Sequence, residues 1–105
     1  MSTTKDFAEY VLDQIGSPLA RTRGMFGEFA LYYDERVVAF ICDNTVFIKI
    51  TPNTKNLLEE VCKRGEAYPG SKDYYIISEE QLENAKFFRN AVELCAEDVP
   101  QKKKK

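Results

Sequence analysis

The chain has 105 residues, of which 44% are hydrophobic, 30% charged and 12% aromatic. A chain of this length forms one domain and buries about 65% of its unfolded surface, which supports a core without disulfide bonds. The composition excludes disorder, and no apolar run reaches the roughly 18 residues of a membrane-spanning helix. Histidine is absent, which excludes His-based acid–base catalysis, His-activated nucleophiles and imidazole metal sites.

The net charge of −2 hides an asymmetry between the body of the chain and its end. Without the basic residues 102–105, 11 Lys and Arg residues stand against 17 Asp and Glu residues, a net charge of −6. An acidic body argues against a broad phosphate-binding surface. We predict a single domain over residues 1–100 and a disordered basic tail over residues 101–105, which alone offers charge to a polyanion.

Three cysteines, Cys42, Cys62 and Cys95, stand at wide spacing without a C-x-x-C pair. This pattern predicts neither a disulfide framework nor a zinc site. Each cysteine lies among apolar residues, which favours buried thiols over reactive ones, because no neighbouring histidine can activate them. The polar N-terminus contains no apolar signal-peptide segment, which predicts a cytoplasmic protein.

The first predicted element is a helix. Thr3 or Thr4 is its N-cap, Asp6 lies in its first turn and Gly16 ends it. One apolar stripe is formed by Phe7, Val11, Leu12 and Ile15.

Three strands are predicted next, over residues 29–33, 37–42 and 46–50. Residues 34–36 form the first turn, and Asp43 and Asn44 suit a two-residue turn because both tolerate positive φ. Connections this short require an antiparallel meander.

A second helix is predicted over about residues 54–64, with Pro52 and Asn53 at its start and Gly65 at its end. A turn over residues 68–72 then joins a short strand near Ala67 to a clearer strand over residues 74–77.

A capping box at Ser78–Gln81 begins the final helix. The predicted class is therefore α+β: a two-layer α/β domain of α-β3-α-β2-α order, in which helices pack mainly on one face of an antiparallel sheet.

The segment Gly24, Met25, Phe26 and Gly27 carries a family resemblance together with the residues after it. Phe29 and Leu31-Tyr32 follow the tetrapeptide, and the next strands read VAFI and VFIK. Over about residues 5–96 the chain resembles the N-terminal domain of the TfoX/Sxy family of bacterial competence regulators. The resemblance implies the fold order given above, coupling to transcription of DNA-uptake genes, frequent pairing with a helical C-terminal domain, and no catalytic residues.

The same segment has the spacing of a nucleic-acid-binding Gly-x-x-Gly loop, but its two central residues are bulky and apolar. We therefore predict a structural turn that buries Met25 and Phe26. No Lys-Ser or Lys-Thr follows, so it is not a phosphate loop.

Arg21 and Arg23 precede this turn at alternate positions of an extended segment, which points both side chains to one face. The pair is a candidate anion contact. The alternative is a solvated edge that pairs with nearby acids such as Glu28.

The predicted sheet contains more apolar residues than one covered face needs. Phe47 lies on the face opposite Val46 and Ile48, where a sheet covered on one side should be polar. We assign Tyr32, Phe47 and Tyr75 to a candidate interface on this face. Tyr74 is the alternative to Tyr75. Helix ends or residues 21–25 are the other candidates to cover it.

The sequence thus predicts a non-catalytic regulatory or protein-interaction domain that binds a protein partner or a second copy of itself. The alternative is a nucleic-acid-binding module that stacks bases on the sheet aromatics and uses the lysine tail. An enzyme is the third hypothesis, and the lack of histidine and of a convergent polar cluster argues against it. No catalytic residue, cofactor, metal or membrane association is assigned.

Overall fold

A computed structural model of the chain describes residues 3–25 and 27–100. Its elements in chain order are α1 (Lys5–Ile15), β1 (Ala20–Met25), β2 (Glu28–Tyr33), β3 (Arg36–Cys42), β4 (Thr45–Ile48), α2 (Pro52–Leu58), β5 (Lys63–Glu66), β6 (Asp73–Ile77), α3 (Glu79–Glu83) and α4 (Ala85–Asp98). The strands form one antiparallel sheet in the order β1-β2-β3-β4-β6-β5. The α+β class and the antiparallel sheet are confirmed.

Local signals fixed α1 and the two central turns. The Thr4 side chain accepts a hydrogen bond from the Phe7 N–H, and Gly16 ends the helix in the left-handed conformation at φ 65°. The two-residue turns after β2 and β3 use positive φ at all four positions, which are Asp34, Glu35, Asp43 and Asn44. Asx residues adopt this conformation at low cost, as the sequence predicted for the second turn.

The strand β1 is an addition to the predicted order. Its six residues pair with β2 along their whole length, from Ala20 opposite Tyr33 to Met25 opposite Glu28. β1 lies at the edge of the sheet, where strands are commonly polar, and its sequence is mostly polar. It therefore lacks the apolar pattern that predicted β2 and β3 from the sequence.

The second helix is shorter than predicted. Thr51 caps it and it ends at Leu58, whereas the sequence had placed its end at Gly65. Gly65 instead lies in β5 opposite Tyr74, and a Cβ at this position would meet Ile76 Cδ1 at 2.8 Å. The glycine therefore permits close packing within a hairpin rather than ending a helix.

The final helical segment is divided at Asn84. Its backbone leaves the helical region at φ −83° and ψ 85°, and its side chain accepts a hydrogen bond from the Phe87 N–H. The predicted capping box holds at the start of α3, where the side chains of Ser78 and Gln81 each bond to the other's backbone N–H.

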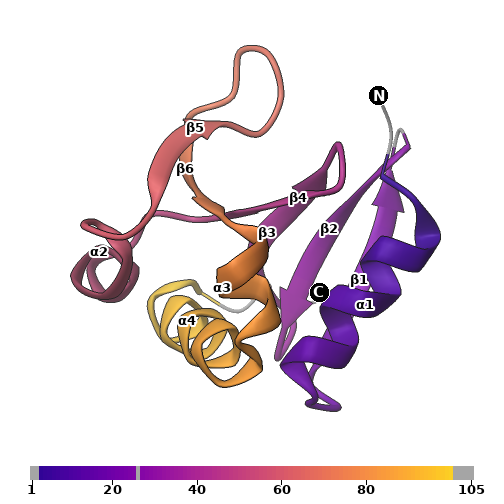
Figure 1. Cartoon of the computed structure of the whole chain (residues 1–105), viewed down its shortest axis with the longest axis horizontal. Helices are drawn as coiled ribbons and strands as arrows, with labels where there is room; N and C mark the ends of the chain where they lie inside the picture. The colour runs from indigo at the N-terminus through magenta and orange to yellow at the C-terminus, as the bar shows by residue number, and fades with distance from the viewer. Residues whose placement is uncertain (1–2, 26, 101–105) are drawn as a thin grey trace.

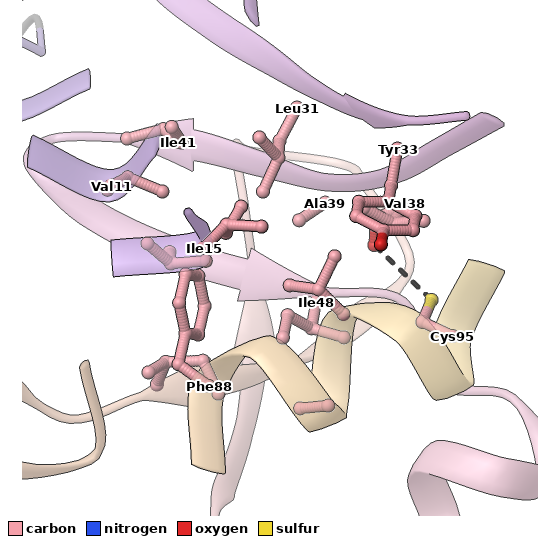
Figure 2. Close-up of a cluster of buried hydrophobic side chains, with 14 of the residues drawn as sticks. Val11, Ile15, Leu31, Tyr33, Val38, Ala39, Ile41, Ile48, Phe88 and Cys95 are labelled. Carbon is pink, nitrogen blue, oxygen red and sulfur yellow. Dashed lines mark hydrogen bonds between the residues drawn. The ribbon is translucent and has the colours of Figure 1, made fainter. Parts of the chain in front are cut away.

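The helices pack on one face of the sheet and enclose the main core. Figure 1 shows α1, α3 and α4 along this side, and Figure 2 shows side chains of α1 and α4 meeting those of β2, β3 and β4. The Cys95 thiol of α4 lies 3.5 Å from the carbonyl oxygen of Val38 on β3. The fully buried members with the largest side chains include Tyr75, Phe88, Ile15, Leu31, Ile41 and Ile48.

A second cluster lies on the opposite, helix-free face. Its buried members are Cys42, Phe47, Ala67 and Tyr74, with Phe40 and Ile76 packed against them. Each of these residues belongs to a strand or to the loop after β5. Among the described residues, no helix is both long and apolar enough to cross a bilayer.

Candidate protein-interaction site

The glycine-flanked segment is a tight connection between β1 and β2. Gly27 adopts φ 82°, a conformation that residues with a Cβ rarely use. Met25, the last residue of β1, is 40% exposed, so the prediction that the turn buries this side chain was wrong. Phe26 lies outside the described residues.

Arg21 and Arg23 lie at alternate positions of β1, as predicted, but Arg21 has its own partners. Its guanidinium forms two bonds with the Glu35 carboxylate, at 2.8 and 3.1 Å, and lies 4.2 Å from the centroid of the Tyr32 ring. The hydrogen bond with Glu35 raises the pKa of Arg21. The acid that pairs with Arg21 is thus Glu35 rather than Glu28, and both arginines are exposed.

The three candidate interface residues divide between the two faces. Tyr32 and Phe47 lie on the helix-free face but are only 7% and 9% exposed. Tyr75 points the other way into the main core, where it is fully buried and its hydroxyl donates a hydrogen bond to Glu59. Tyr74 is therefore the tyrosine of the helix-free face, because Tyr75 pairs with Ile48 in the core-facing row.

A pocket of about 620 Å³ opens on the helix-free face. We call it the hairpin pocket, because its residues come from the β1–β2, β3–β4 and β5–β6 hairpins and the residues that join their strands. Its lining consists of Met25, Glu28, Phe29, Phe40, Cys42, Asp43, Ala67, Tyr68 and Pro69.

The loop after β5 forms one wall of the hairpin pocket. Figure 1 shows this loop on the side of the molecule away from α3 and α4. The Ser71 hydroxyl accepts a hydrogen bond from the Ala67 N–H at 3.0 Å, and Gly70 turns at φ 87°. The loop thereby brings Tyr68 edge-on to Phe40, with ring centroids 6.4 Å apart. Tyr74 meets the same ring at 5.7 Å.

Two carboxylates lie at the pocket among these apolar side chains. Glu28 Oε1 accepts hydrogen bonds from the Thr3 hydroxyl at 2.7 Å and from the Asp43 N–H at 3.1 Å. Burial, and secondly the charge of Glu28, raise the pKa of the Cys42 thiol. The pocket therefore contains a neutral thiol and an acidic edge.

The prediction that the cysteine thiols are buried is confirmed at two of the three positions. Cys42 and Cys95 are buried, while Cys62 is partly exposed and its thiol lies 3.3 Å from Gln81 Oε1. Within residues 3–25 and 27–100, no group of three or more Cys, Asp or Glu side chains has the geometry to hold a metal ion.

The sequence did not reveal the hairpin pocket, because its walls come from three separate hairpins. The one available signal was the large apolar side chain of Met25 beside a glycine and that of Tyr68 beside a proline and glycine. Turn tips are ordinarily polar, so apolar residues there indicate a contact. In the structure both are exposed and both line the pocket.

The chain is thus a small α+β domain with helices on one face of its sheet and an apolar pocket on the other. Its sequence matches the TfoX N-terminal domain over residues 12–99, and the chain belongs to this family. It is also 39% identical over 101 residues to an uncharacterized 12.7 kDa protein in the trpE 5′ region of Spirochaeta aurantia. That similarity covers 95% of this chain and 86% of the relative.

Proposed function

We propose that this chain is a non-catalytic regulatory domain that acts in the cytoplasm by binding a protein through its helix-free face. Membership of the TfoX N-terminal domain family supports a regulatory role linked to transcriptional control of competence. The binding surface is the hairpin pocket and its rim.

The observation that carries the proposal is the exposure of apolar side chains at this pocket. Met25 and Tyr68, which both line this cavity, are 40% and 51% exposed. The uncovered face of an antiparallel sheet is ordinarily polar. Large apolar residues that converge on a cavity at such a face are typical of a binding surface.

The arrangement argues against the nucleic-acid alternative. Tyr32 and Phe47 are buried, so neither presents an open ring face on which a base could stack. Arg21 is paired with Glu35, and the pocket edge carries Glu28 and Asp43, which repel phosphates.

Site-specific photo-crosslinking tests the proposal. A benzophenone amino acid replaces Tyr68 at the pocket, and the matched control replaces Val61, which is 56% exposed and follows α2 on another part of the surface. We expect irradiation in cells to give a discrete protein adduct from position 68 and none from position 61. The same product with purified protein alone identifies a second copy of the chain as the partner.

Equal labelling from both positions, or adducts with nucleic acid only, would reject the proposal.

The competence link has its own test in the host bacterium. Replacing Tyr68 with alanine should lower transcripts of DNA-uptake genes, while replacing Val61 with alanine leaves them unchanged.

A further inference from the structure

The hairpin pocket has the volume of a ligand site and mostly apolar walls. Its volume of about 620 Å³ lies within the roughly 300–1,000 Å³ of ligand pockets in proteins. Phe40, Cys42 and Ala67 form its floor within the second cluster, and Tyr68 and Pro69 form one side. Pockets of this kind hold the anchor side chains that dominate the affinity of protein interfaces.

The charges at the pocket are of one sign. The only ionised side chains in its lining are the carboxylates of Glu28 and Asp43, and no Lys or Arg among the described residues lines it. Glu28 uses Oε1 for Thr3 and Asp43, which leaves Oε2 without a hydrogen-bond partner in the described part of the chain. Lys5 lines an adjoining groove that shares Met25, Glu28 and Phe29 with the pocket.

These two properties define the occupant. An apolar group alone would fit the walls, but it would remove water from the two carboxylates without giving them a partner, which costs free energy. A basic group beside the apolar group would meet those carboxylates at the edge of the pocket.

We propose that the hairpin pocket holds an aromatic side chain of a partner protein that has a basic residue next to it. This inference rests on the proposed function and adds the chemistry by which the partner is recognised. The aromatic ring packs against Phe40 and Tyr68, and the basic group lies between Glu28 and Asp43.

A pair of small probes tests this recognition on the purified protein. Phenethylammonium and 3-phenylpropanoate share the ring and differ in the sign of their charge. In a titration followed by ¹⁵N–¹H correlation spectra, we expect phenethylammonium to shift the amide signals of Cys42, Asp43 and Ala67. It should bind about tenfold more tightly than the anion, a difference of about 1.4 kcal/mol from one favourable charge contact.

Near-isosteric variants distinguish the contribution of the carboxylate charges to probe binding from that of the apolar pocket walls. Glu28→Gln keeps an oxygen for Thr3 and Asp43, and Asp43→Asn keeps a residue that tolerates the positive φ of the turn. The double variant should bind both probes equally. The control, Asp13→Asn with Glu60→Gln, removes two exposed carboxylates away from the pocket and should retain the tenfold preference.

A pocket-filling variant tests the walls. Ala67→Leu should abolish the binding of both probes while the spectrum stays that of a folded protein. Equal affinity of the wild type for the two probes, or shifts confined to residues outside the pocket, would overturn the inference.

The two proposals fail separately. A crosslink from position 68 without probe binding would overturn the anchor inference and leave the interaction surface standing. Probe binding without a crosslink would overturn the protein partner and mark the pocket as a site for a small amine instead.

Discussion

The hydroxyl of Thr3 donates a hydrogen bond to Glu28 across 2.7 Å, which joins residues 25 positions apart in the chain. The same oxygen lies 3.1 Å from the Ile41 carbonyl and accepts a hydrogen bond from the Asn44 N–H at 3.2 Å. The Thr3 N–H also donates to the Gly27 carbonyl. One residue before α1 therefore ties the β1–β2 connection to the β3–β4 hairpin.

Thr3→Val should destabilise the fold, because the substitution keeps the shape of a buried side chain and removes its hydroxyl. A hydrogen bond to a charged group contributes about 1.5–3 kcal/mol, so we expect a loss of about 2 kcal/mol in urea denaturation. The control is Thr45→Val. Within residues 3–25 and 27–100, the Thr45 hydroxyl donates only to the Asp43 carbonyl, and that hydrogen bond is exposed. An equal loss in both variants would show that the hydrogen bonds of Thr3 contribute no more to the free energy of unfolding than the exposed bond of Thr45.

Phe47→Glu should unfold the protein or lower its free energy of unfolding by at least about 3 kcal/mol. Phe47 is 9% exposed in the second cluster, none of whose members is basic, and burying an ionised carboxylate among them costs free energy. Circular dichroism and urea denaturation measure the effect, with Phe47→Leu as the control of similar hydrophobicity. A stable Phe47→Glu variant would mean that this face opens in solution.

The two glycines around Met25 should respond differently to alanine. Gly27 adopts φ 82°, so Gly27→Ala places a Cβ in the left-handed half of the backbone map at a cost of about 1–2 kcal/mol. A Cβ at Gly24 meets nothing closer than 3.7 Å, so Gly24→Ala should change the free energy of unfolding by less than about 0.5 kcal/mol. Thermal denaturation of the two variants compares them directly, and a greater loss at Gly24 would contradict the conformational role of Gly27.

Stability at low pH should depend on Tyr75 and Glu59. The hydrogen bond from the Tyr75 hydroxyl, and then that from Arg64, lower the pKa of the Glu59 carboxyl below its usual value of 4.5. A pKa lower in the folded than in the unfolded state stabilises the fold above pH 4.5, and the contribution is lost as pH falls through the folded-state pKa.

We therefore expect the stability difference between the wild type and Tyr75→Phe to shrink as pH falls below 4.5, measured by denaturation at successive pH values. Tyr68→Phe is the control, and its difference from the wild type should not vary with pH in this range. A constant difference for Tyr75→Phe would rule out the contribution of Glu59.

The three thiols should react in a fixed order: Cys62 first, then Cys42, and Cys95 last. Cys62 is partly exposed, whereas burial raises the pKa of Cys95 to about 12. Labelling with a thiol reagent at pH 8, followed by peptide mass spectrometry, measures each rate, and denaturant should make the three rates equal. Fast native labelling of Cys95 would contradict its burial on the core-facing side of α4.

Features with local signals could be predicted from the sequence, and features that depend on register could not. Caps and turn residues placed α1, the β3–β4 turn and the start of α3, because each acts within a few residues. The end of α2 was missed because Val61 and Cys62 continue the apolar period of the helix beyond Leu58. The face of Tyr75 depends on its pairing with Ile48, and a shift of one residue would have put Tyr74 in the core.

The candidate site could also be predicted only in part from the sequence. The sequence correctly indicated excess apolar surface on the helix-free face, but much of it is covered within the chain. Arg21 lies over Tyr32, and Phe47 packs with Tyr74 in the second cluster. What stays open is the hairpin pocket, which the loop after β5 forms together with the end of β1, the start of β2 and the end of β3.

The strand order leaves β1 and β5 at the two edges of the sheet, and both are rich in charge. If the β1 strands of two molecules paired antiparallel about Thr22, Arg21 of each would face Arg23 of the other. Like charges directly opposite each other destabilise such pairing. Growth of the sheet from molecule to molecule through β1 in this register is thereby opposed, on the edge whose last residue, Met25, lines the open pocket.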